Sequence, residues 1–258
     1  MLIRATWTLA VAETVLLPRA YSLELSKTLH QQLGLTVGEE AIPSTSFSGI
    51  VGRCSRSGDF LAFHPGERYQ LSLSGLQDRS AKAIANWDLD PNLELFGTKF
   101  EVSNRKDDTS SYPALYTTLV ANEPEPRKQF DLEFPQPTAF AQDRLHLPLP
   151  VPALMFRSWL ERWNHFAPVY LGGNDLIDYL KGAIALRKHR LQTRPFRLQQ
   201  GTVNGFIGDV SLTALNRTEP LLANVAHLLV AYAPFAGTGI KTRLGMGYTL
   251  VNKDGHCD

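Results

Sequence analysis

The chain has 258 residues, of which 43% are hydrophobic and 20% are charged, with a formal net charge of +1 at pH 7. This is ordinary globular composition, and the length suits one large domain or two small ones, either of which could bury a proper core. A net charge near zero says nothing about partners by itself, so a site for a polyanion would need locally concentrated positive charge.

The sequence also gives expectations about membrane spans, secretion and the redox state of the cysteines. No apolar run reaches about 18 residues, so we expect no membrane span. Residues 2–11 alternate between polar and apolar side chains and lack the apolar block of a secretory peptide. The two cysteines, Cys54 and Cys257, lie far apart, which favours reduced thiols in a cytoplasmic protein over a disulfide framework or a zinc site.

Strand and helix patterns alternate through the first half of the chain. Tyr21, Leu25, Leu29 and Leu33 recur near helical spacing after Pro18. The predicted elements, in chain order, are a strand at 2–11, a helix at Ala20–Leu33, strands near Ser46–Arg53, Phe60–His64 and Tyr69–Ser74, a helix at Leu76–Trp87 and a strand at Leu93–Ser103. This order predicts the split βαββαβ pattern of a ferredoxin-like domain in the α+β class.

The second half repeats the first in outline. Residues 105–137 are rich in Asp, Ser, Pro and Lys, and EPEPRK at 123–128 is the best linker candidate. The elements predicted after it are a strand at Gln129–Phe134, a helix at Pro152–His165, strands at Leu186–Leu198 and Thr202–Leu215, a helix at Glu219–Tyr232 and a strand at Gly247–Val251. We therefore expect two tandem ferredoxin-like, RRM-like domains, at residues 1–125 and 126–258.

A glycine-rich loop, GTGIKTRLGMG, follows the last predicted helix. It contains four glycines, with two cations between the glycine pairs: Gly237, Gly239, Lys241, Arg243, Gly245 and Gly247. It lacks the Gly-Lys-Ser/Thr of a phosphate loop, and it follows a helix and leads into a strand, the reverse of the dinucleotide fingerprint. Glycine exposes N–H donors and permits positive φ, so we expect the bare backbone to approach a polyanion, with the two cations adding charge.

A basic stretch precedes this loop. No Asp or Glu occurs from Tyr179 to Gly208. The cations inside it are Lys181, Arg187, Lys188, Arg190, Arg194 and Arg197. On a strand, Lys188, Arg190 and Arg194 would share one face. Such a face suits a phosphate backbone, where each contact releases counterions and makes affinity depend on salt.

Three segments resemble the CRISPR repeat-processing endoribonucleases of the repeat-associated mysterious protein superfamily. They are the glycine-rich loop, the GFIGDV segment at 205–210 and, more weakly, the LPVP segment at 149–152. The resemblance implies two tandem ferredoxin-like domains that bind the repeat hairpin of CRISPR precursor RNA and cleave it without metal or cofactor. It also implies a catalytic histidine in or just after the first helix, facing the glycine-rich loop.

RNA cleavage without metal uses the neighbouring 2′-hydroxyl as the nucleophile and leaves a 2′,3′-cyclic phosphate and a 5′-hydroxyl. A histidine suits either proton-transfer role because its pKa lies near neutrality. His30 is the histidine at the place that the resemblance implies, and on a helix Ser26 and Lys27 would be its neighbours. Tyr21 could add a phenol. His64, at a Pro-Gly turn, is the second candidate for the catalytic histidine.

Two other readings remain open at the level of sequence. One is a catalytically inactive RNA-binding subunit of a CRISPR effector complex, and the other is an unrelated nucleotide-binding enzyme. Cleavage of repeat RNA separates the first of these from the nuclease. A homodimer and an effector complex as partner are compatible with the family reading.

Overall fold

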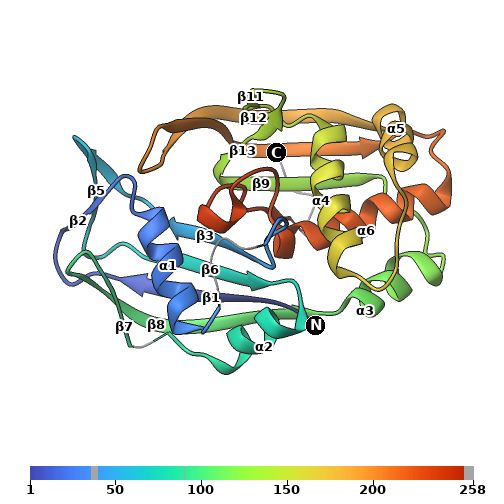
Figure 1. Ribbon diagram of the computed structural model, residues 1–258. Helices are drawn as coiled ribbons and strands as arrows, with labels where there is room; N and C mark the ends of the chain where they lie inside the picture. The colour runs from blue at the N-terminus through green and yellow to red at the C-terminus, as the bar shows by residue number, and fades with distance from the viewer. Residues whose placement is uncertain (36–39, 90, 253–258) are drawn as a thin grey trace.

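The computed structural model describes residues 1–35, 40–89 and 91–252 of the chain. It has a mixed α+β fold in which two antiparallel sheets lie side by side, each with helices packed on it (Figure 1). The first sheet has the strand order β3-β6-β1-β8-β7, and the second has the order β12-β13-β9-β14. In each part the main elements follow one another as strand, helix, strand, strand, helix and strand.

The first sheet forms because its strands alternate apolar residues toward two helices. Its elements are β1 (Leu2–Ala10), α1 (Ser22–Gln32), β3 (Thr45–Val51), β6 (Tyr69–Gly75), α2 (Asp78–Asn86), β7 (Asn92–Leu95) and β8 (Thr98–Ser110). Ile3, Trp7 and Leu9 of β1 are buried in one cluster with Leu25 and Leu29 of α1. A side sheet of β2 (Val15–Pro18), β5 (Phe60–Phe63) and β4 (Ser55–Ser57) extends from it.

The single strand expected at Leu93–Ser103 is wrong, because this segment is a hairpin. Strand β7 pairs with β8 in antiparallel register, and Leu95 lies opposite Thr98. The two turn residues, Phe96 and Gly97, have φ of 53° and 71°, which suits a tight hairpin but is rare for phenylalanine. Strand β8 also runs on to Ser110, into the segment expected to be part of the linker region.

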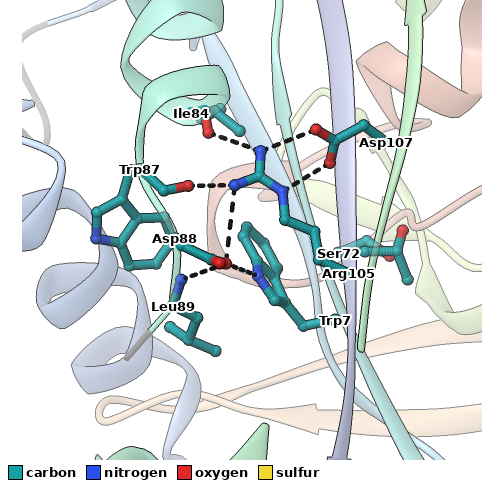
Figure 2. Close-up of polar contacts among 9 residues, drawn as sticks. Trp7, Ser72, Ile84, Trp87, Asp88, Leu89, Arg105 and Asp107 are labelled. Atoms are coloured by element: carbon teal, nitrogen blue, oxygen red, sulfur yellow. Dashed lines mark hydrogen bonds and ion pairs between the residues drawn. The ribbon is translucent and has the colours of Figure 1, made fainter. Parts of the chain in front are cut away.

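Arg105 of β8 fixes the end of α2 onto the first sheet (Figure 2). Its guanidinium donates to the carbonyls of Ile84, at 3.0 Å, and Trp87. It also donates through two nitrogens to the carboxylate of Asp107, at 2.8 and 2.9 Å. The same group lies 5.3 Å from the ring centroid of Trp7. A part-buried arginine here supplies the donors that the carbonyls at a helix end need.

The second sheet carries the longer strands and the larger core. Its elements are β9 (Gln129–Thr138), α4 (Pro152–Phe166), α5 (Asn174–Ala183), β12 (Ile184–Arg197), β13 (Thr202–Ala214), α6 (Pro220–Ala236) and β14 (Leu250–Val251). The sequence did not indicate α5, and β9 continues through two prolines beyond the expected end. A short hairpin, β10 (Phe140–Gln142) with β11 (Leu145–Leu147), follows β9.

The two parts are connected by more than the chain between them. After β8 come α3 (Tyr112–Tyr116) and a π-helical turn (Thr117–Ala121), and residues 123–128 then have no regular structure, as expected for the linker. Across the boundary, Ser46 of β3 donates to the carbonyl of Phe235 at 2.8 Å. The hydroxyls of Ser72 and Tyr248 lie 3.0 Å apart. Helix α6 and the glycine-rich loop therefore pack directly on the first sheet. Among the residues that the structure describes, no helix is both long and apolar enough to span a membrane.

Candidate active site

The glycine-rich loop uses its main-chain donors inside the protein. The amide of Gly239 donates to Ser158 Oγ at 2.8 Å, and that of Gly247 donates to the carbonyl of Pro137 at 3.0 Å. The amide of Gly237 donates to Ala233 at 2.8 Å, closing the last turn of α6. All four glycines are buried. The amides of Gly237, Gly239 and Gly247 thus have acceptors within the protein, whereas the sequence led us to expect bare N–H groups facing a polyanion.

The glycines are needed for close packing at positive φ. A Cβ atom on Gly239 would lie 2.2 Å from the carbonyl oxygen of Ala139, and one on Gly247 would lie 2.0 Å from that of Thr238. Gly245 sits against the backbone of Gly49 in β3, where a Cβ would approach the amide nitrogen to 3.1 Å. The loop can thus touch the first sheet because its residues there have no side chain.

The two cations of the loop remain accessible. Lys241 adopts the left-handed conformation, with φ 54° and ψ 31°, just before a 3₁₀ turn at Thr242–Leu244. Both Lys241 and Arg243 are half-buried and line a cavity of about 610 Å³ between the loop and α4. Arg157 and Glu161 of α4 lie on its wall. Arg243 also lines a second, small pocket beside α1.

Helix α1 meets the loop at Ser26 and His30. The hydroxyl of Ser26 donates to the carbonyl oxygen of Arg243 at 2.9 Å. His30 lines the small pocket together with Arg243 and Glu40. In Figure 1 the loop, drawn in red, lies between α1 and α4. The fold therefore brings together a histidine from one end of the chain and an arginine from the other.

The His30 ring is held from both sides. Its Nδ1 lies 2.6 Å from the carbonyl oxygen of Ser26, and its Nε2 lies 2.8 Å from Thr45 Oγ1. Because a carbonyl only accepts, Nδ1 carries the proton of the neutral ring and Nε2 accepts from Thr45. The residue is 2% exposed. Burial is the main cause that lowers the pKa of His30 from 6.5, and the charge of Arg243 lowers it further.

The other two predicted catalytic residues are Lys27 and Tyr21. Lys27 of α1 is exposed. The Tyr21 hydroxyl accepts from the amide of Ile50 at 2.9 Å, and burial raises its pKa. This hydroxyl lies beside Gly49 of β3, the residue against which Gly245 of the loop packs. Ser26 therefore contacts the loop directly, His30 lines a pocket with Arg243, and the Tyr21 hydroxyl lies next to the residue on which the loop packs.

His64, the second candidate, lies at the end of a strand of the side sheet. It follows β5, and its Nε2 is 2.7 Å from Ser55 Oγ in the side sheet. Its Nδ1 is 3.4 Å from Thr14 Oγ1. It lines none of the cavities that contain Lys241 or Arg243. His30 is thus the better placed of the two histidines.

The cations of the basic stretch lie in several different places. Arg194 and Arg197 of β12 line a cleft of about 320 Å³, where Arg19 and Arg56 of the first part face them. We call this group of four the arginine cleft. The other cations lie outside it: Lys181 is on α5, Arg187 donates to the Gln129 side chain, and Lys188 and Arg190 are exposed along β12.

The sequence reasoning missed Arg19, Arg56 and Arg162. Neither Arg19 nor Arg56 lies in a charge run, so nothing local indicates that the fold gathers them. Arg162 could have been noticed in the sequence, because it follows Trp159 by three residues and precedes Trp163 directly in the predicted helix. A charge on an apolar helix face usually has a specific partner.

Metal ligands and cysteines add little to this site. Within the described ranges, no group of three or more His, Cys, Asp or Glu side chains could hold a metal ion. Cys54 is a free, exposed cysteine that lines the arginine cleft. Cys257 lies outside the described residues.

Known proteins are similar to this chain both in sequence, over its second part, and in fold. The family model of the CRISPR-associated endoribonuclease Cas6 matches residues 132–249. The CRISPR-associated endoribonuclease Cas6 of Mycobacterium tuberculosis is 32% identical over 124 residues, 48% of this chain and 38% of that protein. That of Streptococcus thermophilus is 26% identical over 129 residues, 50% of this chain and 52% of that protein. The chain spans about half or less of the length of these relatives.

The fold is similar over nearly the whole chain. A solved structure of a Cas6 product complex superposes with a TM-score of 0.73 at 23% identity, covering 98% of this chain and 100% of that one. Residues 132–249 are therefore similar in sequence to the CRISPR-associated endoribonuclease Cas6 family, and nearly the whole chain is similar in fold to a solved Cas6 structure.

Proposed function

We propose that this protein is a metal-independent endoribonuclease that binds the repeat hairpin of CRISPR precursor RNA and cleaves it. The single observation that carries the proposal is the meeting of His30 with Arg243 where the glycine-rich loop touches α1. A proton-transfer group beside a cation is what phosphodiester cleavage by a 2′-hydroxyl requires. The similarity of residues 132–249 to the CRISPR-associated endoribonuclease Cas6 family model supports the substrate class.

In this proposal His30 acts as the general base. Its Nε2 is the unprotonated nitrogen and accepts a hydrogen bond from the Thr45 hydroxyl at 2.8 Å. A ribose 2′-hydroxyl that replaced the Thr45 hydroxyl would present its proton to the same nitrogen. Arg243 would stabilise the negative charge of the phosphate as the 2′-oxygen attacks. The products would be a 2′,3′-cyclic phosphate and a 5′-hydroxyl.

RNA contacts follow from the accessible cations. We propose that Lys241 and Arg243 bind phosphates near the cleavage position and that the arginine cleft, with Lys188 and Arg190 beside it, binds more of the hairpin backbone. Residues 1–125 and 126–258 would each form a ferredoxin-like domain, and the RNA would contact both. Cleavage of cytoplasmic precursor RNA would supply guides to an effector complex.

One assay tests the function. The protein is incubated with labelled repeat RNA from the same genome in excess EDTA, and the products are mapped. We expect one cut in each repeat, and a 2′-deoxy substitution at the cleavage position should abolish cutting with affinity nearly unchanged. Cutting of the deoxy RNA would contradict the proposed nucleophile. Binding without cutting of either RNA would indicate the inactive RNA-binding subunit.

A further inference from the structure

Arg162 is a buried cation next to the glycine-rich loop. It lies in α4, is 9% exposed and takes part in none of the ion pairs found among the described residues. Its Nε has no hydrogen-bond partner there. A buried guanidinium without a carboxylate costs stability, so its hydrogen bonds should serve a specific purpose.

Those hydrogen bonds hold one residue of the loop from both sides. Arg162 Nη2 donates to the carbonyl of Gly239 at 2.7 Å, and Ser158 Oγ accepts from the amide of Gly239 at 2.8 Å. Arg162 Nη1 donates to Ser158 Oγ at 2.6 Å and to the Ser158 carbonyl at 2.8 Å. The two side chains that bind Gly239 are thus also bound to each other. Ser158 and Arg162 are four residues apart, so they share one face of α4.

We propose that Arg162 and Ser158 form a positioning pair that sets Arg243 beside His30. This inference rests on the proposed function. The hydrogen bonds of Arg162 go to Ser158, Gly239 and Thr242, so it acts on Arg243 through the backbone between Gly239 and Arg243. Its Nη2 also lies 3.5 Å from Thr242 Oγ1, in the 3₁₀ turn that carries Arg243.

The far end of this short segment is fixed to helix α1. The carbonyl of Arg243 accepts from Ser26 Oγ, one helical turn from His30. The segment from Gly239 to Arg243 is thus held by α4 at one end and by α1 at the other. Release of the α4 end would let Arg243 move relative to His30 while leaving both sheets intact.

Arg105 provides a matched control. It also donates to two backbone carbonyls, those of Ile84 and Trp87, and it is part-buried. Those contacts lie at the end of α2 (Figure 2), and neither of them involves a residue of the loop. Lysine keeps the charge of arginine but lacks its planar fork, so Arg162→Lys and Arg105→Lys each remove a two-carbonyl arrangement and keep the net charge.

The test combines hydrogen exchange with kinetics on the full chain. Without RNA, Arg162→Lys should raise amide exchange at least about tenfold across residues 237–247, and Arg105→Lys should not. In single-turnover cleavage at saturating protein, Arg162→Lys should lower the rate about tenfold. The double variant of Arg162→Lys with Arg243→Ala should be no slower than Arg243→Ala alone, because both act at one point.

Several outcomes would overturn the inference. Unchanged amide exchange across residues 237–247 in Arg162→Lys is one. Another is a double variant whose cleavage rate falls by the product of the two factors seen in the single variants. If Arg162→Lys does not fold, Ser158→Ala removes the acceptor of the Gly239 amide and is judged by the same two measurements. If the unmodified protein does not cut repeat RNA, the proposed function fails, while the exchange comparison still decides whether the pair holds the loop.

Discussion

His30 combines two properties that oppose each other in a catalytic base. Burial and the nearby charge of Arg243 keep its pKa low, so the ring is neutral at physiological pH and can accept a proton. The same burial covers Nε2 with Thr45. In the proposed mechanism RNA must therefore displace the Thr45 hydroxyl before the ring can act, so substrate binding should precede a local rearrangement at this strand.

Replacing His30 tests its role directly. His30→Ala should lower the single-turnover cleavage rate about 10²-fold or more, from loss of acid–base help, with a smaller effect on RNA affinity. Rates and affinities are measured on the same labelled repeat RNA. A rate close to that of the unmodified protein would move the assignment to His64, and His64→Ala is made alongside for that reason.

Stability should depend on pH through His30, which is buried, and His227, which is half-buried. The pKa of His30 is lowered by burial, and so is the pKa of His227, which Arg127 lowers further. Their stabilising contribution is complete above the unfolded value of 6.5 and is lost as pH falls through the folded pKa, because only the unfolded chain then takes up the proton readily. The free energy of unfolding should thus fall below pH 6.5, by at most about 1.4 kcal/mol per pH unit for each histidine.

Urea unfolding between pH 5 and 8 measures this dependence. His30→Gln and His227→Gln should each make the fall below pH 6.5 shallower. His146→Gln is the control, because His146 is exposed on β11. A fall of the same steepness in all three variants would show that other groups cause it.

At the scale of elements, the glycine-rich loop is defined by where its main chain is packed. Gly239 and Gly201 both have positive φ, of 77° and 87°. A Cβ on Gly239 would meet the Ala139 carbonyl at 2.2 Å, whereas a Cβ on Gly201, in the β12–β13 turn, would have nothing within 4 Å. Comparing substitutions at Gly239 and Gly201 therefore separates the cost of backbone strain from the cost of a steric clash.

Alanine at each position gives the comparison. Gly201→Ala should lower the free energy of unfolding by about 1 kcal/mol, from the left-handed conformation alone. Gly239→Ala should cost about 3 kcal/mol or more, because overpacking adds to that strain, and it should also slow cleavage. Equal losses in urea unfolding would show that the loop shifts easily and that its packing is loose.

The elements show which physical signals a sequence carries. Periodic apolar residues predicted α1, α4 and α6 within a few residues of their observed ends, because burial against a sheet produces that period. The β7–β8 hairpin escaped prediction because its turn places Phe96 at positive φ. The role of the glycines was predicted as exposure to a ligand, yet their spacing serves contacts with Ala139 and Gly49, which only the tertiary structure reveals.

The candidate site was predictable in part. The place of His30 on the first helix and of the loop near the carboxyl end could be read from the residues and the family resemblance. The exposure of Lys27 and the hydrogen bond of the Tyr21 hydroxyl to β3 could not, because both depend on how α1 packs against the first sheet. Arg19 and Arg56 join Arg194 and Arg197 only through the relative placement of the two sheets.

For the whole molecule, this arginine cleft predicts how RNA binding depends on salt. Each cation that contacts a phosphate contributes about 0.7 to 0.9 to the slope of log affinity against log salt. Arg56→Ala and Arg194→Ala should each weaken binding of repeat RNA and reduce that slope by about 1. Lys99→Ala, an exposed cation on β8, is the control. Slopes unchanged by all three would place the RNA elsewhere.

The seating of the loop on α1 has a consequence for a severed chain. A break within residues 123–128 would leave His30 on one fragment and Arg243 on the other, since the backbone between them runs through that segment. Neither fragment would hold a complete reaction centre. Reassembly would then become a bimolecular event governed by fragment concentration, whereas the intact chain supplies the partner at a high effective concentration.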